Sequence, residues 1–279
     1  MCMLIGHLSK ERRENEYLQY IDRRGRDAFG AYFDGLIIKT FTKDNFVEKL
    51  SGIRSRVMLC VGRAVPATER HTFMRMNHRS KDDIQPFVEG DWIVTHNGLL
   101  HNDVELERNY RLKRPTKVDS AIIPALLHYF TTREGRSEDE AVDLVLQKIR
   151  GSFALVIHNK KTKQVWLVTN FMPLYFKVVD KGVAWSSLSL DDSFVPLKPY
   201  TGIMFSYHNN SEYIERFKLK TDLDTRRVGV ICSGGMDSVT ALRLYQVLGF
   251  NTKLIHFSYG QAAQDVEDYV TTQIAEKYN

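Results

Sequence analysis

The sequence begins MCMLIGHLSKERR (residues 1–13), with a cysteine directly after the initiator methionine. Residue two decides how the N-terminus matures, because a small second residue lets methionine aminopeptidase remove Met1. Cys2 would then carry a thiol and a free α-amine on one residue. A cysteine can also stand there by chance, so the rest of the chain must decide between the two interpretations.

The composition is that of a globular protein. The 279 residues suggest about two domains, with 43% hydrophobic and 26% charged residues. The three cysteines, Cys2, Cys60 and Cys232, form no C-x-x-C pair, which argues against a disulfide framework or a cysteine zinc site and for a reducing, cytoplasmic compartment. Cys60 and Cys232 lie in apolar stretches and are expected in the core. The histidines show no metal-binding pattern, so no metal site is expected.

No membrane segment or secretory signal is expected, because no apolar run approaches ~20 residues and no charged n-region opens the chain. The formal net charge is +5, and basic residues gather at 23–26, at Arg54 and Arg56, and over 70–81. They form a solvated basic face or attract nucleotides, polyphosphates or RNA. Charge alone leaves both open.

Residues before about 217 are rich in predicted strands. The β-branched or aromatic runs bounded by turn residues are 3–8, 29–41, 56–64, 91–98, 152–159, 164–170, 174–179 and 202–208. Two helices are predicted over 119–133 and 137–150 from apolar spacings of three and four, the second starting with a Ser137–Glu140 capping box. This order predicts an α+β layered domain with antiparallel sheets.

The pattern of apolar and polar residues changes after a polar linker expected over 218–226. VGVIC (228–232) predicts a buried parallel strand, SGGMDS (233–238) a turn, and residues 239–249 an amphipathic helix that ends at Gly249. A second strand over 252–260 and the start of another helix complete one βαβ unit and part of the next. The domains are therefore predicted as 1–217 and 227–279.

Four short stretches follow Cys2 along the chain, and both their residues and their order are informative. Alone, each is explained by a turn, a helix cap or a surface charge. Together they resemble the class II glutamine amidotransferase domain, an N-terminal-nucleophile hydrolase whose chain begins M-C-G. The stretches are RGRDAFG (24–30), GRAVP (62–66), HNG (96–98) and VDS (118–120), with IQPF (84–87) as a further point of similarity.

The resemblance covers roughly the first 200 residues and implies a four-layer αββα sandwich. It makes Cys2 the nucleophile that attacks the glutamine amide. A thiol with a pKa near ~8.5 needs a base, and the α-amine of the same residue, with a pKa near ~7.7 to 8.0, can serve. The Asn97 side chain and the Gly98 N–H would hold the oxyanion. Arg63 would pair with the α-carboxylate of glutamine and Asp119 with its α-ammonium group.

Other residues of this domain receive structural roles. Arg24 and Asp27 are expected to support the site, and His96 to orient the turn that carries Asn97. Met3 stands where the family usually has glycine, and its side chain is expected to crowd the backbone beside the nucleophile.

The SGGMDS turn resembles the PP-loop of ATP pyrophosphatases, at the start of a partial α/β, Rossmann-like unit. Glycines let the backbone approach a polyanion, and the N-terminus of the following helix offers free N–H groups. The resemblance implies ATP, with Mg²⁺, as cosubstrate. The residues that would hold its pyrophosphate end are Ser233, Gly234, Gly235, Asp237 and Ser238.

HFSYGQ (256–261) resembles the F-D-Y-G-Q of 7-cyano-7-deazaguanine synthases, with Ser258 for the aspartate and Ala263 for a later histidine. This implies transfer of ammonia from glutamine to a 7-deazaguanine acceptor, a carboxy group or a nitrile, in the queuosine and archaeosine pathway; the fused amidotransferase favours the amidine product. An asparagine-synthetase-like amidation and a non-catalytic assembly subunit are the alternatives.

Only 54 residues follow Thr225, whereas domains of the synthase kind run to roughly 200. The missing part is expected on a second polypeptide, or the chain is truncated. A partly parallel sheet with an open edge and uncovered apolar faces also predicts a partner chain or a homo-oligomer. Nucleic acid is a further candidate partner, and a membrane is not.

Overall fold

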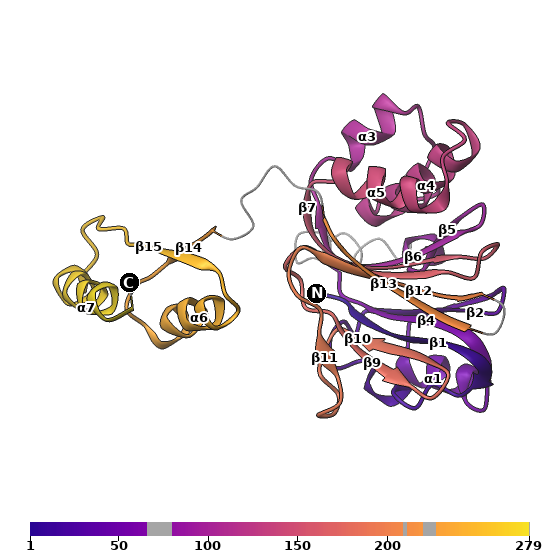
Figure 1. Ribbon diagram of the computed structural model, residues 1–279, viewed down its shortest axis with the longest axis horizontal. Coiled ribbons are helices and arrows are strands. Elements are labelled where there is room, and N and C mark those ends of the chain that lie inside the picture. The colour runs from indigo at the N-terminus through magenta and orange to yellow at the C-terminus, as the bar shows by residue number, and fades with distance from the viewer. Residues whose placement is uncertain (66–79, 209–210, 220–226, 279) are drawn as a thin grey trace. The chain divides into compact units, whose positions relative to one another are not determined.

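The computed structural model describes residues 1–65, 80–208, 211–219 and 227–278 (Figure 1). The chain divides into two units, Met1–Lys220 and Thr221–Asn279. The predicted boundary at 217 falls inside the last strand of the first unit, and residues 220–226, most of the expected linker, lie outside the described residues.

The first unit contains two antiparallel sheets. The seven-stranded sheet has the order β11-β9-β10-β1-β4-β2-β3. Its strands are β1 (Met3–Arg13), β2 (Ala28–Phe33), β3 (Leu36–Thr40), β4 (Ser55–Arg63), β9 (Tyr175–Val179), β10 (Gly182–Ser186) and β11 (Val195–Pro196). The six-stranded sheet has the order β13-β12-β8-β7-β6-β5. Its strands are β5 (Phe87–Glu89), β6 (Trp92–Leu100), β7 (Gly151–Asn159), β8 (Val165–Thr169), β12 (Thr201–His208) and β13 (Ser211–Lys218).

Helices cover the outer faces of both sheets, which confirms the four-layer αββα sandwich (Figure 1). α3 (Asp103–Asn109), α4 (Ile122–Thr132) and α5 (Glu138–Lys148) pack on the six-stranded sheet around residues such as Trp92 and Leu126. α1 (Lys43–Leu50) packs on the other sheet through Phe46. A third apolar cluster, with Leu59 and Val156, fills the space between the sheets.

The predicted helices are present with shifted starts. The Ser137–Glu140 capping box is confirmed: Ser137 Oγ accepts from Glu140 N at 3.3 Å, and Ser137 N donates to Glu140 Oε2 at 3.0 Å. α4 begins after Asp119–Ala121, which form the 3-10 turn η3. Further 3-10 turns are η1 (Leu18–Tyr20) and η2 (Lys81–Asp83). α1 and α3 were not predicted because each buries too few residues to give an apolar period.

The second unit follows the predicted βαβ order. β14 (Arg227–Ile231) and β15 (Asn251–Ile255) pair in parallel, and α6 (Met236–Val247) and α7 (Gln264–Tyr278) follow them. α6 begins three residues earlier than predicted because the end of the SGGMDS turn forms its first turn. Gly249 follows this helix with φ +83°, as expected for a C-cap.

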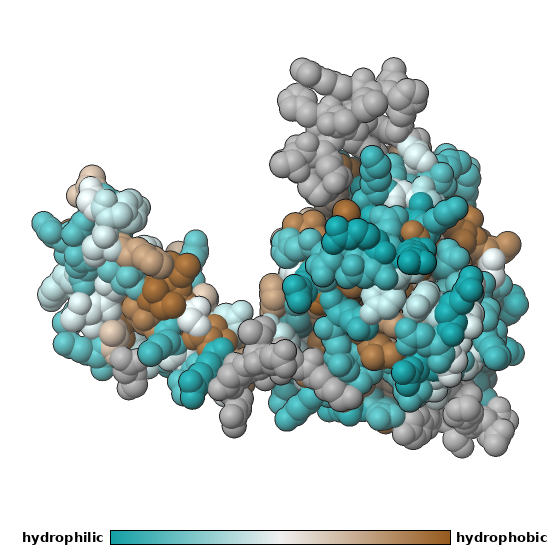
Figure 2. All heavy atoms as spheres, turned by 90° about the horizontal axis from the view of Figure 1, so that it is seen from above, coloured by the Kyte–Doolittle hydropathy of each residue, from teal (hydrophilic) through white to brown (hydrophobic). Residues whose placement is uncertain are grey.

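The expectation of a buried strand at 228–232 is right for one face only. Val230 and Cys232 are buried, but the Ile231 side chain is 67% exposed and Ile255 on the neighbouring strand is 40% exposed. Successive residues of a strand point to opposite faces, so this pair is an exposed apolar spot on a face that also carries Arg227, Asn251 and Lys253. Figure 2 shows apolar side chains at the surface of this unit.

The cysteines are free thiols and all are buried, so Cys60 and Cys232 are core residues as predicted. Within the described residues, every helix is too short or too polar to cross a membrane.

Candidate functional site

Cys2 lies immediately before β1, and its side chain is 8% exposed in the cluster between the two sheets. Met1 is 68% exposed. The N-terminal methionine is therefore open to an aminopeptidase, while the thiol behind it is held in the fold.

The side chain of Met3 lies away from the Cys2 thiol, and the expected crowding of the backbone beside the nucleophile stays a prediction. Cys2 and Leu4 belong to the cluster between the sheets, whereas Met3 and Ile5 are buried in the cluster under α1. The reason is strand geometry: β1 turns alternate side chains to opposite faces of its sheet. The side chain of Met3 therefore packs on the other side of the sheet from the nucleophile.

Asn97, on β6, makes the most direct contact with Cys2. The Cys2 backbone N donates to Asn97 Oδ1 at 2.7 Å. Asn97 is fully buried, and its Nδ2 reaches no acceptor among the described residues. A buried amide donor left without an acceptor costs about 1–3 kcal/mol, so such a group is a candidate to bind a ligand.

Gly98 presents its N–H on the edge of β6 that faces away from β7. His96 N on this edge donates to Gln85 Oε1 at 2.6 Å, and Leu100 N donates to Asp119 Oδ2 at 2.6 Å. Because N–H groups alternate in direction along an antiparallel strand, the N–H of Gly98 lies between these two.

Only glycine fits at position 98. Its φ is +152°, and a Cβ there would lie 1.9 Å from the carbonyl oxygen of Ser152. The close approach of the two backbones is by itself enough to require glycine at this position, whatever its catalytic role. It also fixes the direction of the Gly98 N–H.

Arg63 is the last residue of β4 and is 5% exposed. The RGRDAFG stretch braces the backbone around it: Asp27 N donates to Arg63 O at 3.0 Å, and Val65 N donates to Asp27 Oδ2 at 2.8 Å. Gly25, at φ +75°, packs so closely that a Cβ would lie 2.3 Å from Gly62 O. Asp27 thus supports the arginine loop. Arg24 lies near the N-terminus, where its Nη2 is 2.8 Å from the Met1 sulfur.

His96, directly before Asn97 on β6, contacts Ser120. Burial lowers the pKa of His96, so the ring is neutral. Its Nε2 lies 3.2 Å from the Ser152 carbonyl, which only accepts, so Nε2 carries the proton. Ser120 Oγ lies 2.7 Å from Nδ1 and 3.1 Å from Asp119 Oδ1, while Ser120 N donates to Asp119 Oδ1 at 2.8 Å. These contacts fix the His96 ring, and its role in orienting the turn that carries Asn97 stays a prediction.

The thiol of Cys2 is in an environment that opposes ionisation. Burial raises its pKa, and the carboxylate of Asp119 raises it further. The N–H of Ala64, the terminal amine and the Arg63 guanidinium act in the opposite direction without reversing the shift. Met3 pairs with Gly62 across β1 and β4, so Cys2 lies next to the strand end that carries Arg63, and a thiol with a raised pKa needs a base to react.

The structure thus brings together all five residues predicted for the glutamine site. They come from four segments: Cys2, Arg63, Asn97 with Gly98, and Asp119. Three contributors were not predicted: Ala64, Gln85 and Ser120. The IQPF stretch was the available signal for Gln85, because its resemblance was noticed without a role being assigned.

The SGGMDS turn of the second unit connects β14 to α6. Gly234 has φ +83°, and Gly235 is the N-cap residue, with no side chain that caps α6. The Ser238 Oγ donates back to Gly235 O at 2.9 Å. The first intrahelical bond runs from Val239 N, so the N–H groups of 236–238 have no acceptor within the helix. Ser233 and Asp237 are exposed beside them.

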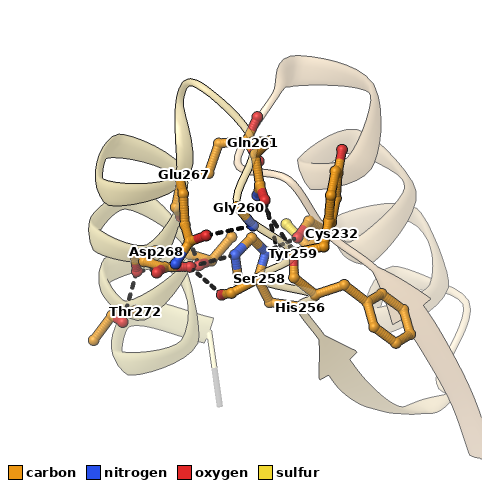
Figure 3. A network of polar contacts seen from close by, with 12 residues as sticks. Cys232, His256, Ser258, Tyr259, Gly260, Gln261, Glu267, Asp268 and Thr272 are labelled. Atoms are coloured by element: carbon orange, nitrogen blue, oxygen red, sulfur yellow. Dashed lines mark hydrogen bonds and ion pairs between the residues drawn. The ribbon is translucent and has the colours of Figure 1, made fainter.

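A polar network ties this turn to α7 (Figure 3). His256 contacts the Cys232 carbonyl through Nδ1 at 2.8 Å and Asp268 Oδ1 through Nε2 at 2.6 Å. Ser258 Oγ donates to the same oxygen of Asp268 at 2.6 Å. The Cys232 carbonyl, and then Asp268, raise the pKa of His256. His256 and Asp268 were not singled out from the sequence, because no pattern joins residues 24 or 12 positions apart.

Two family models match the chain. The glutamine amidotransferase domain matches residues 71–190, a range that holds Asn97, Gly98 and Asp119, and the model described as queuosine biosynthesis protein QueC matches residues 227–279. Residues 71–190 thus match a glutamine amidotransferase domain, and residues 227–279 match a QueC segment. This confirms the two resemblances seen in the sequence.

Relatives of the amidotransferase–QueC chain have the same pairing. It is 36% identical to the 7-cyano-7-deazaguanine synthase of Saccharolobus solfataricus, over 93% of this chain and 58% of the relative. It is 34% identical to 7-cyano-7-deazaguanine synthase 2 of Sulfurisphaera tokodaii, over 99% of this chain and 63% of the relative. The chain thus spans about three fifths of the length of these relatives. Domain and relatives together indicate an enzyme.

The fold of the amidotransferase–QueC chain is also found in solved structures. Glutamine phosphoribosylpyrophosphate amidotransferase from B. subtilis aligns with a TM-score of 0.60 at 14% identity, covering 95% of this chain and 70% of that one. The allosteric regulatory enzyme of purine biosynthesis gives 0.61 at 13%, covering 96% and 70%. At these identities the likeness shows the fold alone.

Proposed function

We propose that Cys2 hydrolyses glutamine and that the ammonia goes to a 7-deazaguanine acceptor activated by ATP at residues 233–238. One observation carries the first half of the proposal. Asn97 Oδ1 holds the Cys2 nitrogen at 2.7 Å while its Nδ2, fully buried, has no acceptor among the described residues. One amide thus fits both tasks, holding the base and stabilising an oxyanion.

Removal of Met1 turns the Cys2 nitrogen into an α-amine that accepts the thiol proton. The thiolate attacks the side-chain amide carbon of glutamine, and the oxyanion takes hydrogen bonds from Asn97 Nδ2 and the Gly98 N–H. Collapse of this intermediate releases ammonia, which carries away the proton held by the amine, and leaves a thioester. Water then hydrolyses the thioester to glutamate. One oxyanion donor is worth about 3–4 kcal/mol.

Glutamine recognition falls to Arg63 and Asp119. A guanidinium binds a carboxylate with two parallel hydrogen bonds, which suits the α-carboxylate of the substrate. Asp119 faces the α-ammonium group. Its two oxygens already accept from Leu100 N and Ser120 N, which fixes the carboxylate and leaves each oxygen further lone pairs.

The turn at 233–238 fits the phosphates of ATP. The N–H groups at the start of α6 lack a side-chain cap, and the helix dipole favours an anion there. The described residues contain no cluster of three His, Cys, Asp or Glu side chains suited to a metal. Mg²⁺ would therefore arrive with the phosphates and add the exposed Asp237 carboxylate to its ligands.

The acceptor is proposed from the relatives' names and the HFSYGQ stretch, and the fused amidotransferase favours an amidine product. The exposed side chains of Ile231 and Ile255 support a covering partner, either a second polypeptide that completes the synthase domain or a second copy of this chain. The free thiols fit the reducing, cytoplasmic compartment predicted from the sequence.

The test of the glutaminase begins with the intact mass of the purified, folded protein. We expect Met1 to be absent and glutamate to form from glutamine. Cys2→Ala should abolish glutamate formation, while Cys232→Ala, a buried cysteine of the other unit, should retain it. Glutaminase activity in a chain that keeps Met1 would overturn the α-amine mechanism.

The acceptor is tested separately with [amide-¹⁵N]glutamine, ATP and the partner that co-purifies from the native host. We expect ¹⁵N in a 7-deazaguanine product from the 7-carboxy or 7-cyano base. Label in asparagine after addition of aspartate would favour the asparagine-synthetase alternative. Full synthase activity without a second polypeptide would overturn the split-domain proposal.

A further inference from the structure

A cavity of about 880 Å³ lies in the first unit, and its lining includes none of the residues of the candidate site around Cys2. It is lined by the second half of β1, the β2–β3 turn, the start of β4 and the β7–β8 turn. Cys2 lies just before the start of β1, and Leu8 of the cavity lies six residues further on. At about 3.3 Å per residue this places the cavity roughly 20 Å from the nucleophile.

The cavity carries an excess of positive charge. Five basic and two acidic side chains line it. The two acids are already engaged: Asp34 accepts from Arg56 N and Val57 N and lies 3.5 Å from Arg12, and Glu11 lies 2.6 Å from Lys181 outside the cavity.

Three cations remain at the mouth, and we name them the cationic rim: Arg56, Lys160 and Lys163. Among the described residues, none of their side chains has an ion-pair or hydrogen-bond partner. Lys160 and Lys163 lie three residues apart in the turn between β7 and β8. A rim of uncommitted cations over a preformed hollow favours an anion.

The floor of the cavity is apolar with two buried polar groups. Leu8 and Val57 supply the apolar part, and Tyr32 and His158 are 4% and 1% exposed, with ring centroids 5.6 Å apart. His158 Nδ1 lies 2.9 Å from Gln164 O and donates to it. Burial lowers the pKa of His158 to about 4, so at neutral pH its Nε2 is an acceptor.

We propose that this cavity binds a nucleoside phosphate, with the phosphate on the cationic rim and the nucleoside against the floor. The rim supplies charge for one compact anion. The apolar floor offers a surface against which the ring of the base can pack, and His158 supplies an acceptor for an N–H or O–H of the base or sugar. A polynucleotide would need a stripe of cations along the surface, whereas these three converge on one hollow of ligand size.

The test is calorimetric titration of the full chain with GMP and AMP. The double variant Lys160→Gln, Lys163→Gln removes two rim charges from a surface turn. Lys161→Gln, in the same turn and exposed but outside the cavity lining, is the matched control. We expect the double variant to weaken nucleotide binding by about tenfold or more, and the control to bind as the parent does.

Each component of the ligand is then titrated alone. Guanosine and inorganic phosphate should each bind more weakly than GMP. Phosphate that binds as tightly as GMP, or a single-stranded oligonucleotide that binds more tightly through the same lysines, would overturn the proposal. So would GMP affinity that is unchanged when Lys160→Gln and Lys163→Gln are combined with Gly234→Ala, which removes the nucleotide site proposed at residues 233–238.

Discussion

The two candidate sites are built in opposite ways. Around Cys2, four segments between residues 2 and 119 bring buried side chains together inside a four-layer core. The SGGMDS turn is one continuous stretch, and what it offers is mostly exposed backbone on an open two-stranded sheet. The first site is held by packing, whereas the second is held by the local conformation of the chain.

The difference predicts which substitutions break each site. A site held by packing should lose its chemistry when one polar atom is exchanged, with little change in the fold. A site made of backbone should depend on its glycines and on the helix that follows it. The largest expected effect is therefore at Asn97.

Asn97→Asp keeps an oxygen for the Cys2 nitrogen and replaces the Nδ2 donor with a second acceptor. We expect kcat for glutamine hydrolysis to fall by about 10²–10³-fold with a small change in KM, because the donor acts on the oxyanion. Steady-state kinetics measure both constants. Asn102→Asp is the control: this buried asparagine donates to Lys148 O, and its loss should leave kcat nearly unchanged. Equal losses in the two variants would mean that Asn97 is only structural.

The histidines of the two units should respond to pH with opposite signs. His7 is buried under the first sheet, and burial lowers its pKa from 6.5 to about 4. The unfolded chain therefore takes up the proton first, and stability is lost as the pH falls from 6.5 to 4, by on the order of 3 kcal/mol. The pKa of His256 is raised, so its contribution is present below pH 6.5 and is lost as the pH rises through the folded value.

Hydrogen exchange resolved by peptide measures the two units separately. Acidification from pH 7 should destabilise the first unit, and His7→Gln, whose amide can still donate to Ser55 O, should weaken that dependence without removing it, because burial also lowers the pKa values of His96 and His158. His256→Gln should destabilise the second unit more at pH 6 than at pH 8. Val168→Ala leaves a cavity in the apolar cluster between the six-stranded sheet and its helices. It should lower the stability of the first unit by the same amount at every pH. A single pH dependence shared by both units would contradict this comparison.

Gly234→Ala tests how far the turn depends on its backbone. Both Gly234 and Gly249 have φ +83°, a conformation that costs alanine about 1 kcal/mol. At 234 the new Cβ would also lie 2.8 Å from Val270 on α7, whereas at 249 it meets no atom of the described residues within 4 Å. We expect Gly234→Ala to destabilise the second unit more than Gly249→Ala and to abolish ATP binding, measured by exchange and calorimetry. Equal ATP affinity in the two variants would argue that the SGGMDS turn does not bind ATP.

Local signals carried the sequence predictions furthest. The capping box at Ser137, the C-cap at Gly249 and the SGGMDS turn depend on neighbours within a few residues, and each lies where it was expected. The side-chain direction of Met3 was missed, because it depends on which face of β1 covers which core. The cavity at Arg56 was missed for the same reason, since four distant segments form it and only the basic residues were visible.

The smallest predicted effect contrasts two helix N-termini. Ser137 caps α5 through its side chain, so Ser137→Ala should cost about 1 kcal/mol in the first unit whether or not ATP is present. No side chain caps α6, and Ser238 Oγ donates to a carbonyl rather than accepting from the helix. Ser238→Ala should therefore leave the helix N–H groups as they are, while ATP itself stabilises α6 by taking their hydrogen bonds. Thermal unfolding with and without ATP separates the two cases. An α6 that gains nothing from ATP would show that its open N-terminus serves no phosphate.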